Sequence, residues 1–273
     1  MGLFPDYNKA GPGIDKDAPK KRGIFLYFEL LWRYLWKFVL SNMLYVSISL
    51  PVLLVYHYLF FGIFSGIYGA DASVEAINHS ALVFTVTLAV FWGTGPASCG
   101  YTHILRNMAR EEHVWVSLDF FKTAKKSFKH GFIFLIVDLV VFLTSMVALS
   151  VYSSYAKSSS MLYTIPMGIV IFALGMYTLM HFFMYEFEIT FENKVKEIYK
   201  NSMIASIAAI PMCAVITAII CFLTYIILSA MKNGIIVAVS FIIWVGLMRF
   251  MIDLYTARFI KRHFLKDSKE SEE

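Results

Sequence analysis

Six apolar stretches divide the chain, and each is long enough to form a transmembrane helix. About 20 consecutive apolar residues are needed to cross the hydrocarbon core of a bilayer. Four of the stretches contain no Asp, Glu, Lys or Arg: 38–70, 76–105, 158–185 and 201–231. The other two carry isolated charges, Asp138 in 131–156 and the pair Arg249 and Asp253 in 234–256. We therefore expect an all-α membrane protein with six transmembrane helices, at about 40–64, 81–104, 131–153, 162–186, 204–228 and 234–256.

The composition excludes an ordinary soluble domain. Charged residues make up 16% of the 273 residues, against about 25% in soluble proteins. A chain that is 59% hydrophobic lacks the polar side chains needed to cover itself in water, so it must be solvated by lipid. The aromatic content of 17% suits anchoring at two membrane interfaces. The three cysteines lie in apolar stretches with no CxxC pair, and we expect them to serve in helix packing.

The distribution of lysine and arginine predicts the orientation. Of the 24 basic residues, only Lys157 and Lys232 fall in the loops expected on one side of the membrane. Because positive loops stay cytoplasmic, both termini are expected on the cytoplasmic side of the plasma membrane. We expect a disordered tail at 1–22, a single transmembrane domain at 23–262 and a charged tail at 263–273.

Three segments between the stretches are amphipathic. In 113–129, Val114, Leu118, Phe121 and Phe128 recur near helical spacing, which is typical of a helix in the headgroup plane. The rest of this segment is covered by Lys122, Lys125, Lys126 and Lys129. Similar but shorter or more aromatic patterns occupy 24–37 and 192–201. These segments are predicted either to anchor the protein at the lipid interface or to form a docking surface for a cytoplasmic partner.

An aromatic–lysine pair occurs near the end of each amphipathic segment: Trp36-Lys37, Phe128-Lys129 and Tyr199-Lys200. Two apolar stretches follow each pair. This pattern favours three parallel repeats, each an interfacial helix followed by a helical hairpin, as internal repeats occur in membrane transport folds. Coincidence in an apolar composition is the alternative.

The second predicted span contains a candidate helix break at Gly95 and Pro96. Proline has no amide hydrogen and clashes with the preceding helical turn, so the helix must at least kink. Small residues surround it over 93–100, which allows another helix to approach closely. The break can serve packing alone, or it can expose backbone carbonyls to a solute as in transporters.

Five ionisable residues are expected in one layer of the cytoplasmic leaflet. They are His103, Arg106, Asp138, His181 and Arg249. Charges within a membrane are costly and are usually paired, so we predict an ion pair between Asp138 and Arg249. The i,i+4 pair of Arg249 and Asp253 competes with it. The layer is either a structural clamp or part of a solute or proton pathway.

The sequence has no HExxH, GxSxG or Walker motif and no clustered Cys and His residues at metal-binding spacing. It also resembles no nucleic-acid-binding module. We therefore expect neither an enzyme nor a cofactor site, and no nucleic-acid partner.

One region of the chain resembles the YesL-like family of bacterial membrane proteins, whose domain has no established function. The similarity rests on elements that occur in order: Gly95-Pro96-Ala97, Leu105-Arg106-Asn107, Glu111-Glu112-His113-Val114-Trp115, Asp119-Phe120-Phe121 and Phe128-Lys129. The resemblance implies a bacterial source and genes near sugar-uptake ABC transporters. It suggests an accessory or regulatory component of carbohydrate uptake that contacts ABC-transporter subunits. The alternative is a secondary transporter or channel for a small solute.

Overall fold

The computed structural model describes residues 23–68, 73–158, 160–230 and 234–265. The predicted tail 1–22 and most of the predicted tail 263–273 lie outside this part of the chain. The described residues form helices and no strand. The elements are α1 (Ile24–Arg33), α2 (Leu35–Tyr68), α3 (Val74–Phe91), α4 (Pro96–Ala109), α5 (Val116–Lys126), α6 (Phe128–Ser158), η1 (Met161–Tyr163), α7 (Thr164–Thr190), α8 (Val195–Ala208), α9 (Ile210–Ala230) and α10 (Gly234–His263).

Five segments of the described chain are long and apolar enough to cross a membrane. They are Leu35–Ile67, Val74–Phe91, Phe128–Ala156, Met161–Thr190 and Ile210–Ile227. Large apolar side chains on these helices, such as Val147 and Phe172, face outward. The all-helical, multispanning architecture is therefore compatible with the structure. The sixth predicted span, 234–256, lies in α10, which is not among these five.

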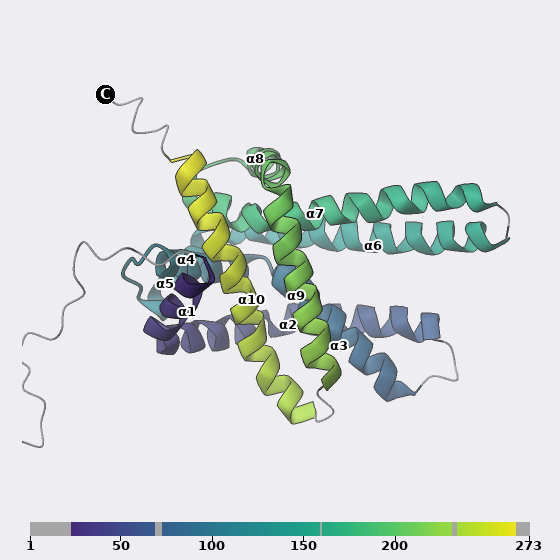
Figure 1. Cartoon of the computed structure of the whole chain (residues 1–273), viewed down its shortest axis with the longest axis horizontal. Helices are drawn as coiled ribbons and strands as arrows, with labels where there is room; N and C mark the ends of the chain where they lie inside the picture. Colours follow the sequence, from purple (N-terminus) through teal and green to yellow (C-terminus); the bar gives the residue numbers. More distant parts are fainter. Residues whose placement is uncertain (1–22, 69–72, 159, 231–233, 266–273) are drawn as a thin grey trace, which may run out of the picture.

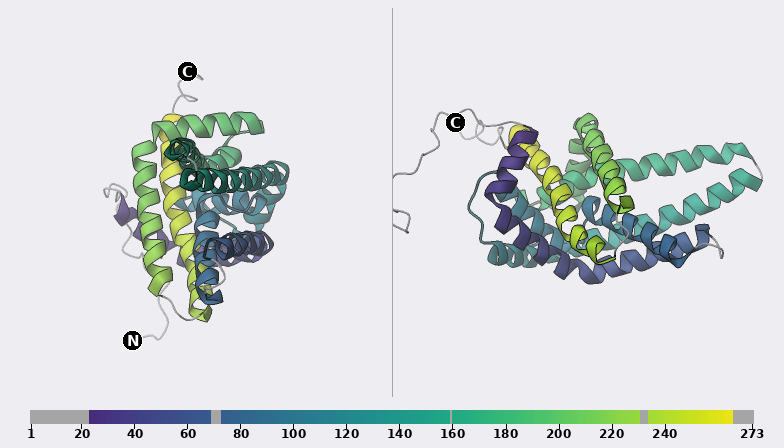
Figure 2. Two further views of the ribbon diagram at one scale, coloured as in Figure 1. Left: turned by 90° about the vertical axis from the view of Figure 1, so that its right-hand side faces the viewer. Right: turned by 60° about the horizontal axis from the view of Figure 1, so that its bottom comes forward.

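The α2–α3 and α6–α7 hairpins run along the long axis of the molecule, and the end of α2 and the start of α3 lie at the same end of it as the end of α6 and the start of α7 (Figure 1). Helices α1, α4 and α5 gather at the opposite end. The α9–α10 hairpin crosses the α6–α7 hairpin instead of running beside it. When α6 and α7 are viewed end-on, α9 and α10 are seen from the side (Figure 2). The helices predicted as spans therefore do not form one parallel bundle.

The second predicted span, 81–104, is not one helix. Helix α3 ends at Phe91 and α4 begins at Pro96. Gly93 and Gly95, between them, have φ angles of 77° and 73°, which favour glycine because other residues are strained there. Proline fits the first position of a helix, where its missing amide hydrogen would have no partner. The sequence therefore breaks the helix fully rather than kinking it.

Three short helices each join a long helix through a single residue. The linking residues are Tyr34 before α2, Ser127 before α6 and Ala209 before α9. Their backbone angles are alike, with φ between −107° and −93° and ψ between 9° and 16°. The same bend therefore recurs at all three junctions.

The third junction differs from the sequence-based prediction in its position. Helix α8 continues to Ala208, beyond the predicted segment 192–201, and α9 starts at Ile210 rather than near residue 204. Tyr199 and Lys200 consequently lie inside α8 and not at its end. The continuous apolar sequence after Asn201 concealed this bend, because hydrophobicity does not mark where one helix ends and the next begins.

Helix α4 is enclosed by other helices. Twelve of its 14 residues are buried, and it contacts α2, α5, α6, α7 and α10. Its sequence is more polar than that of the long helices, with Ser98, Thr102, Arg106 and Asn107 among the buried residues. In lipid, polar groups are stabilised inside the protein, so this short polar helix is enclosed by apolar ones.

Candidate functional site

The break between α3 and α4 leaves backbone groups that no helix satisfies. Such groups have no water partner in a membrane and must bind protein atoms. The Tyr185 hydroxyl, from α7, donates to the Trp92 carbonyl at 2.9 Å and accepts from the Gly95 amide at 3.3 Å. Arg249, from α10, donates to the Val90 carbonyl at 3.0 Å. Two other helices therefore close the break.

The opposite side of the break is closed by hydroxyl groups. The Thr94 amide donates to the Ser98 hydroxyl at 2.7 Å, and the Thr94 hydroxyl lies 2.6 Å from that of Ser49 on α2. The Tyr45 ring stacks on Tyr101 with 4.5 Å between centroids. Residues from α2 thus complete the polar surroundings of the break.

Two glycines allow the break to contact α6 directly. A Cβ atom on Gly131 would lie 2.7 Å from the Pro96 nitrogen, and one on Gly95 would lie 2.8 Å from the Gly131 carbonyl oxygen. Real Cβ contacts are not this short, and both obstacles are backbone atoms. The candidate helix break at Gly95 and Pro96 is therefore also a point where the backbone of α6 packs closely.

Arg249 is buried and has four types of contact. Besides the Val90 carbonyl, its guanidinium donates to the Thr102 hydroxyl at 3.1 Å and lies 3.7 Å from an Asp253 oxygen. Its central carbon is 5.2 Å from the centroid of the Tyr185 ring, within the range of a cation–π interaction. Arg249 therefore ties α10 to α3, α4 and α7.

Asp138 has other partners. Its Oδ1 lies 3.0 Å from His181 Nε2 and accepts a hydrogen bond from the Tyr177 hydroxyl at 2.6 Å. The predicted ion pair between Asp138 and Arg249 is wrong, and the competing local pair of Arg249 and Asp253 is the one present. The reason is topological: the α6–α7 hairpin sets Asp138 opposite His181, while the break supplies a free carbonyl to Arg249.

A second histidine–carboxylate pair lies on the same hairpin. His130 Nδ1 is 2.9 Å from Glu188. On α6, His130 lies eight residues before Asp138, and on α7, Glu188 lies seven residues after His181. Because the helices are antiparallel, the two pairs lie at different levels of the hairpin. In one pair the histidine comes from α6 and the carboxylate from α7, and in the other pair the reverse holds. Phe134 and Tyr185, whose ring centroids are 6.0 Å apart, lie between them. The inner pair is fully buried, whereas the His130 side chain is 33% exposed.

Arg106 binds the C-terminal end of α7. It donates to the Ile189 carbonyl at 3.1 Å and to the Thr190 hydroxyl at 3.2 Å, and it contacts His103 Nδ1 at 3.0 Å. The last carbonyls of a helix lack intrahelical partners and attract positive charge. The five residues predicted to share one layer thus form three groups: Asp138 with His181, His103 with Arg106, and Arg249 at the break.

Sequence reasoning missed Tyr185 and Glu186. Tyr185 closes the break, and Glu186 is fully buried, with Arg110 3.4 Å away. A broken helix requires hydrogen-bond donors and acceptors from other helices, so the predicted break was the signal that polar side chains such as these should be sought on neighbouring helices. Tyr185 nonetheless looks like one more aromatic in an apolar run, and Glu186 stands at the end of a predicted span.

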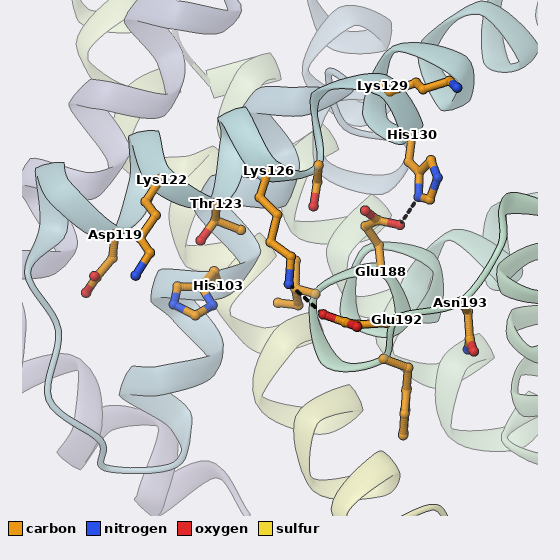
Figure 3. Close-up of a pocket in the computed structure, with 13 residues that line it drawn as sticks. His103, Asp119, Lys122, Thr123, Lys126, Lys129, His130, Glu188, Glu192 and Asn193 are labelled. Carbon is orange, nitrogen blue, oxygen red and sulfur yellow. Dashed lines mark hydrogen bonds and ion pairs between the residues drawn. The ribbon is translucent and has the colours of Figure 1, made fainter.

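A cavity of about 570 Å³ opens where α5, α6 and the end of α7 meet (Figure 3). Lys122 extends from α5 toward His103, and Lys126 extends toward Glu192. Lys129 extends away from these side chains. Lys125, the fourth lysine of the predicted surface, does not line it. The lining residues are His103, Asp119, Lys122, Thr123, Lys126, Ser127, Lys129, His130, Glu188, Ile189, Phe191, Glu192 and Asn193.

Within the described part of the chain, no three His, Cys, Asp or Glu side chains are grouped so that they could hold a metal ion. Comparison with known proteins found no family model, no curated protein and no solved structure that matches this chain. The contacts among its own residues are therefore the basis for a functional proposal.

Proposed function

We propose that this protein is an accessory or regulatory membrane component of carbohydrate uptake, and not an enzyme. The observation that carries the proposal is the closure of the helix break by Tyr185 and Arg249. These two side chains occupy the backbone groups that a transporter would offer to a solute. The polar interior then serves to join helices, and the protein acts through its surface.

The end of the molecule that holds α1 and α5 supports a docking role. Phe25 and Trp32 on α1 are 73% and 80% exposed, and Leu118 and Phe121 on α5 are 67% and 54% exposed. Lysines flank the α5 residues. Large exposed apolar patches mark membrane or protein contacts. We place this end, with both termini, on the cytoplasmic side of a plasma membrane.

The partner class comes from the resemblance to the YesL-like family. That resemblance suggests subunits of a sugar ABC transporter, whose cytoplasmic side would meet α1 and α5.

The experiment is an affinity purification from native membranes combined with a flux assay. We expect transporter subunits to copurify with the parent protein and with Phe172→Ser, which alters an exposed residue of α7 away from the proposed surface. Phe121→Ser should lose them, because it alters the proposed surface on α5. Liposomes containing the protein alone should show no solute flux. Substrate-specific flux without a partner would contradict the accessory role.

A second candidate, a secondary transporter or channel, is favoured by one observation. Asp138 Oδ2 and His181 Nδ1 are buried without hydrogen-bond partners. The Trp92 ring stacks on His181, with 5.6 Å between centroids, and also lines an apolar cavity of about 850 Å³. Trp92 thus contacts both this cavity and an incompletely satisfied polar pair. Flux in liposomes that is lost in both Asp138→Asn and His181→Gln, but kept in Tyr225→Phe, would favour transport.

Six spans and three hairpin repeats are also part of the proposal. The shared bend at Tyr34, Ser127 and Ala209 supports them, since each bend joins a short helix to a hairpin. Reporter tags at both termini and near residues 74, 157 and 231 test the topology. An external C-terminus would contradict it.

A further inference from the structure

The cavity beside α5 is built from three elements that meet at the end of the membrane-spanning hairpin. Lys122 and Lys126 come from α5, His130 from the first turn of α6, and Glu188 from the last turn of α7 (Figure 3). Its volume of about 570 Å³ falls within the usual range for small-molecule sites. The cavity is therefore large enough for a lipid headgroup.

The acidic groups around the cavity are already engaged. Asp119 accepts a hydrogen bond from the Trp115 amide at 2.8 Å, and Glu188 holds His130 at 2.9 Å. Glu192 contacts Lys126 at 3.2 Å, but the two side chains are 89% and 74% exposed. An exposed pair of this kind contributes little, so another anion can replace Glu192 on Lys126.

Lys129 lines the cavity without an ion-pair partner in the described part of the chain, but it extends away from the other lining side chains (Figure 3). Lys122 also takes part in none of the ion pairs found among the described residues. Its side chain extends toward His103 on the cavity side of α5 (Figure 3). Lys122 lies one helical turn before Lys126, so both ammonium groups can approach one phosphate from the same face. The Thr123 hydroxyl, also in the lining, adds a hydrogen-bond donor.

An apolar surface begins directly beside these polar groups. Phe128 lies in the chain between Ser127 and Lys129, which both line the cavity. Its ring is stacked on Phe132, with 6.2 Å between centroids. Phe128 and Phe132 are 59% and 48% exposed. A charged cavity next to an exposed aromatic face on a membrane-spanning helix matches the two halves of a phospholipid.

We propose that this cavity binds an anionic phospholipid. Lys122 and Lys126 hold the headgroup phosphate, Thr123 donates to it, and the acyl chains lie along Phe128 and Phe132. Basic pockets between helices on the cytoplasmic side are suited to such headgroups. The site is separate from the proposed docking role, since it requires lipid and no protein partner.

The test uses the purified full-length chain in a neutral detergent and measures thermal unfolding with added lipid. We expect phosphatidylglycerol to raise the Tm of the parent and phosphatidylcholine to leave it almost unchanged. Lys122→Gln/Lys126→Gln should lose at least half of this rise. The matched control Lys125→Gln/Lys200→Gln removes the same charge outside the cavity and should keep the rise. Added salt should weaken it, because the attraction is electrostatic.

Three outcomes would overturn the proposal. An equal lipid response in the cavity variant and its control would mean that general charge attraction, and no built site, accounts for the effect. A Tm rise of the same size with soluble glycerol phosphate would show that the cavity binds a free phosphate and not a lipid. An undiminished response in Phe128→Ser/Phe132→Ser would show that the acyl chains do not lie along these two rings. Each variant is compared with its own Tm without lipid, so a general loss of stability is not mistaken for lost binding.

Discussion

The break between α3 and α4 and the cavity beside α5 both concentrate polar groups, but they treat them differently. At the break, Arg249 is 2% exposed and Cys99, on the first turn of α4, is 0% exposed, so polar atoms there have only protein partners. At the cavity, Lys126 and Glu192 remain largely in solvent. Buried partners are difficult to exchange because an unpaired polar group in a low-dielectric interior is destabilising. Exposed partners can be replaced by a ligand. The break is thus suited to holding helices together and the cavity to binding.

The largest effect is expected from Arg249→Met. This change leaves the Val90 carbonyl without its donor and Asp253 as a buried unpaired charge, which should lower stability by about 3–5 kcal/mol. Thermal unfolding in detergent measures it. Arg249→Met/Asp253→Asn should recover part of the loss. If Asp138→Asn recovered the loss instead, Arg249 would be paired with Asp138, which contradicts the contacts in the structure.

Gly131→Ala should be the next most destabilising change. The new Cβ would meet the backbone of Pro96, so α6 must move away from the break, at a cost of about 1–3 kcal/mol. Gly168→Ala on α7 is the control because nothing lies within 4 Å of its Cβ position. It should be neutral or stabilise the helix by up to about 1 kcal/mol. Equal effects of the two substitutions on Tm would show that close packing at the break is unimportant.

Tyr185→Phe removes one hydroxyl and keeps the ring. The Trp92 carbonyl and the Gly95 amide each lose a partner, so we expect a loss of about 1–3 kcal/mol. Hydrogen exchange of the amides at 92–95 should rise at the same time. Tyr225→Phe, at a 67% exposed position, should change neither quantity. A silent Tyr185→Phe would mean that the break is stabilised by packing alone.

The smallest effect on stability is expected at the cavity. Glu192→Gln removes an exposed ion pair and should change the free energy of unfolding by less than about 0.5 kcal/mol. It should strengthen the Tm response to phosphatidylglycerol, because Lys126 is then free for the phosphate. A large loss of stability would show that the exposed pair contributes as buried ones do, and the contrast between the two regions would fail.

The sequence predicted the helical class and most long helices because their hydrophobicity is a local property. Apolar runs located α2, α6, α7 and α9 to within several residues. The prediction failed where a bend falls inside an apolar run, at Ala209. At Pro96 it located the break but treated 81–104 as one kinked span, whereas α3 and α4 are separate helices. Apolar residues fit either side of such a bend equally well, so composition carries no signal for it.

The partners of the buried charges could not be predicted. Asp138 and Arg249 have similar predicted depths in their helices, and depth alone made them a pair. Their actual partners depend on which helices are neighbours: α7 places His181 against Asp138, and the break offers Arg249 a carbonyl. Tyr185 was overlooked for the same reason, because its role requires an unwound segment on another helix.

By itself, the sequence determined that the chain is helical and apolar and that its second long stretch breaks at Gly95-Pro96. These properties follow from residue chemistry: apolar side chains leave water, and proline and glycine restrict or free the backbone locally. Only the tertiary structure decided that α9 and α10 cross the other hairpins, that Arg249 and Tyr185 close the break, and that two lysines of α5 share a cavity with α7. These contacts join residues from different helices, and their existence depends on how the helices pack.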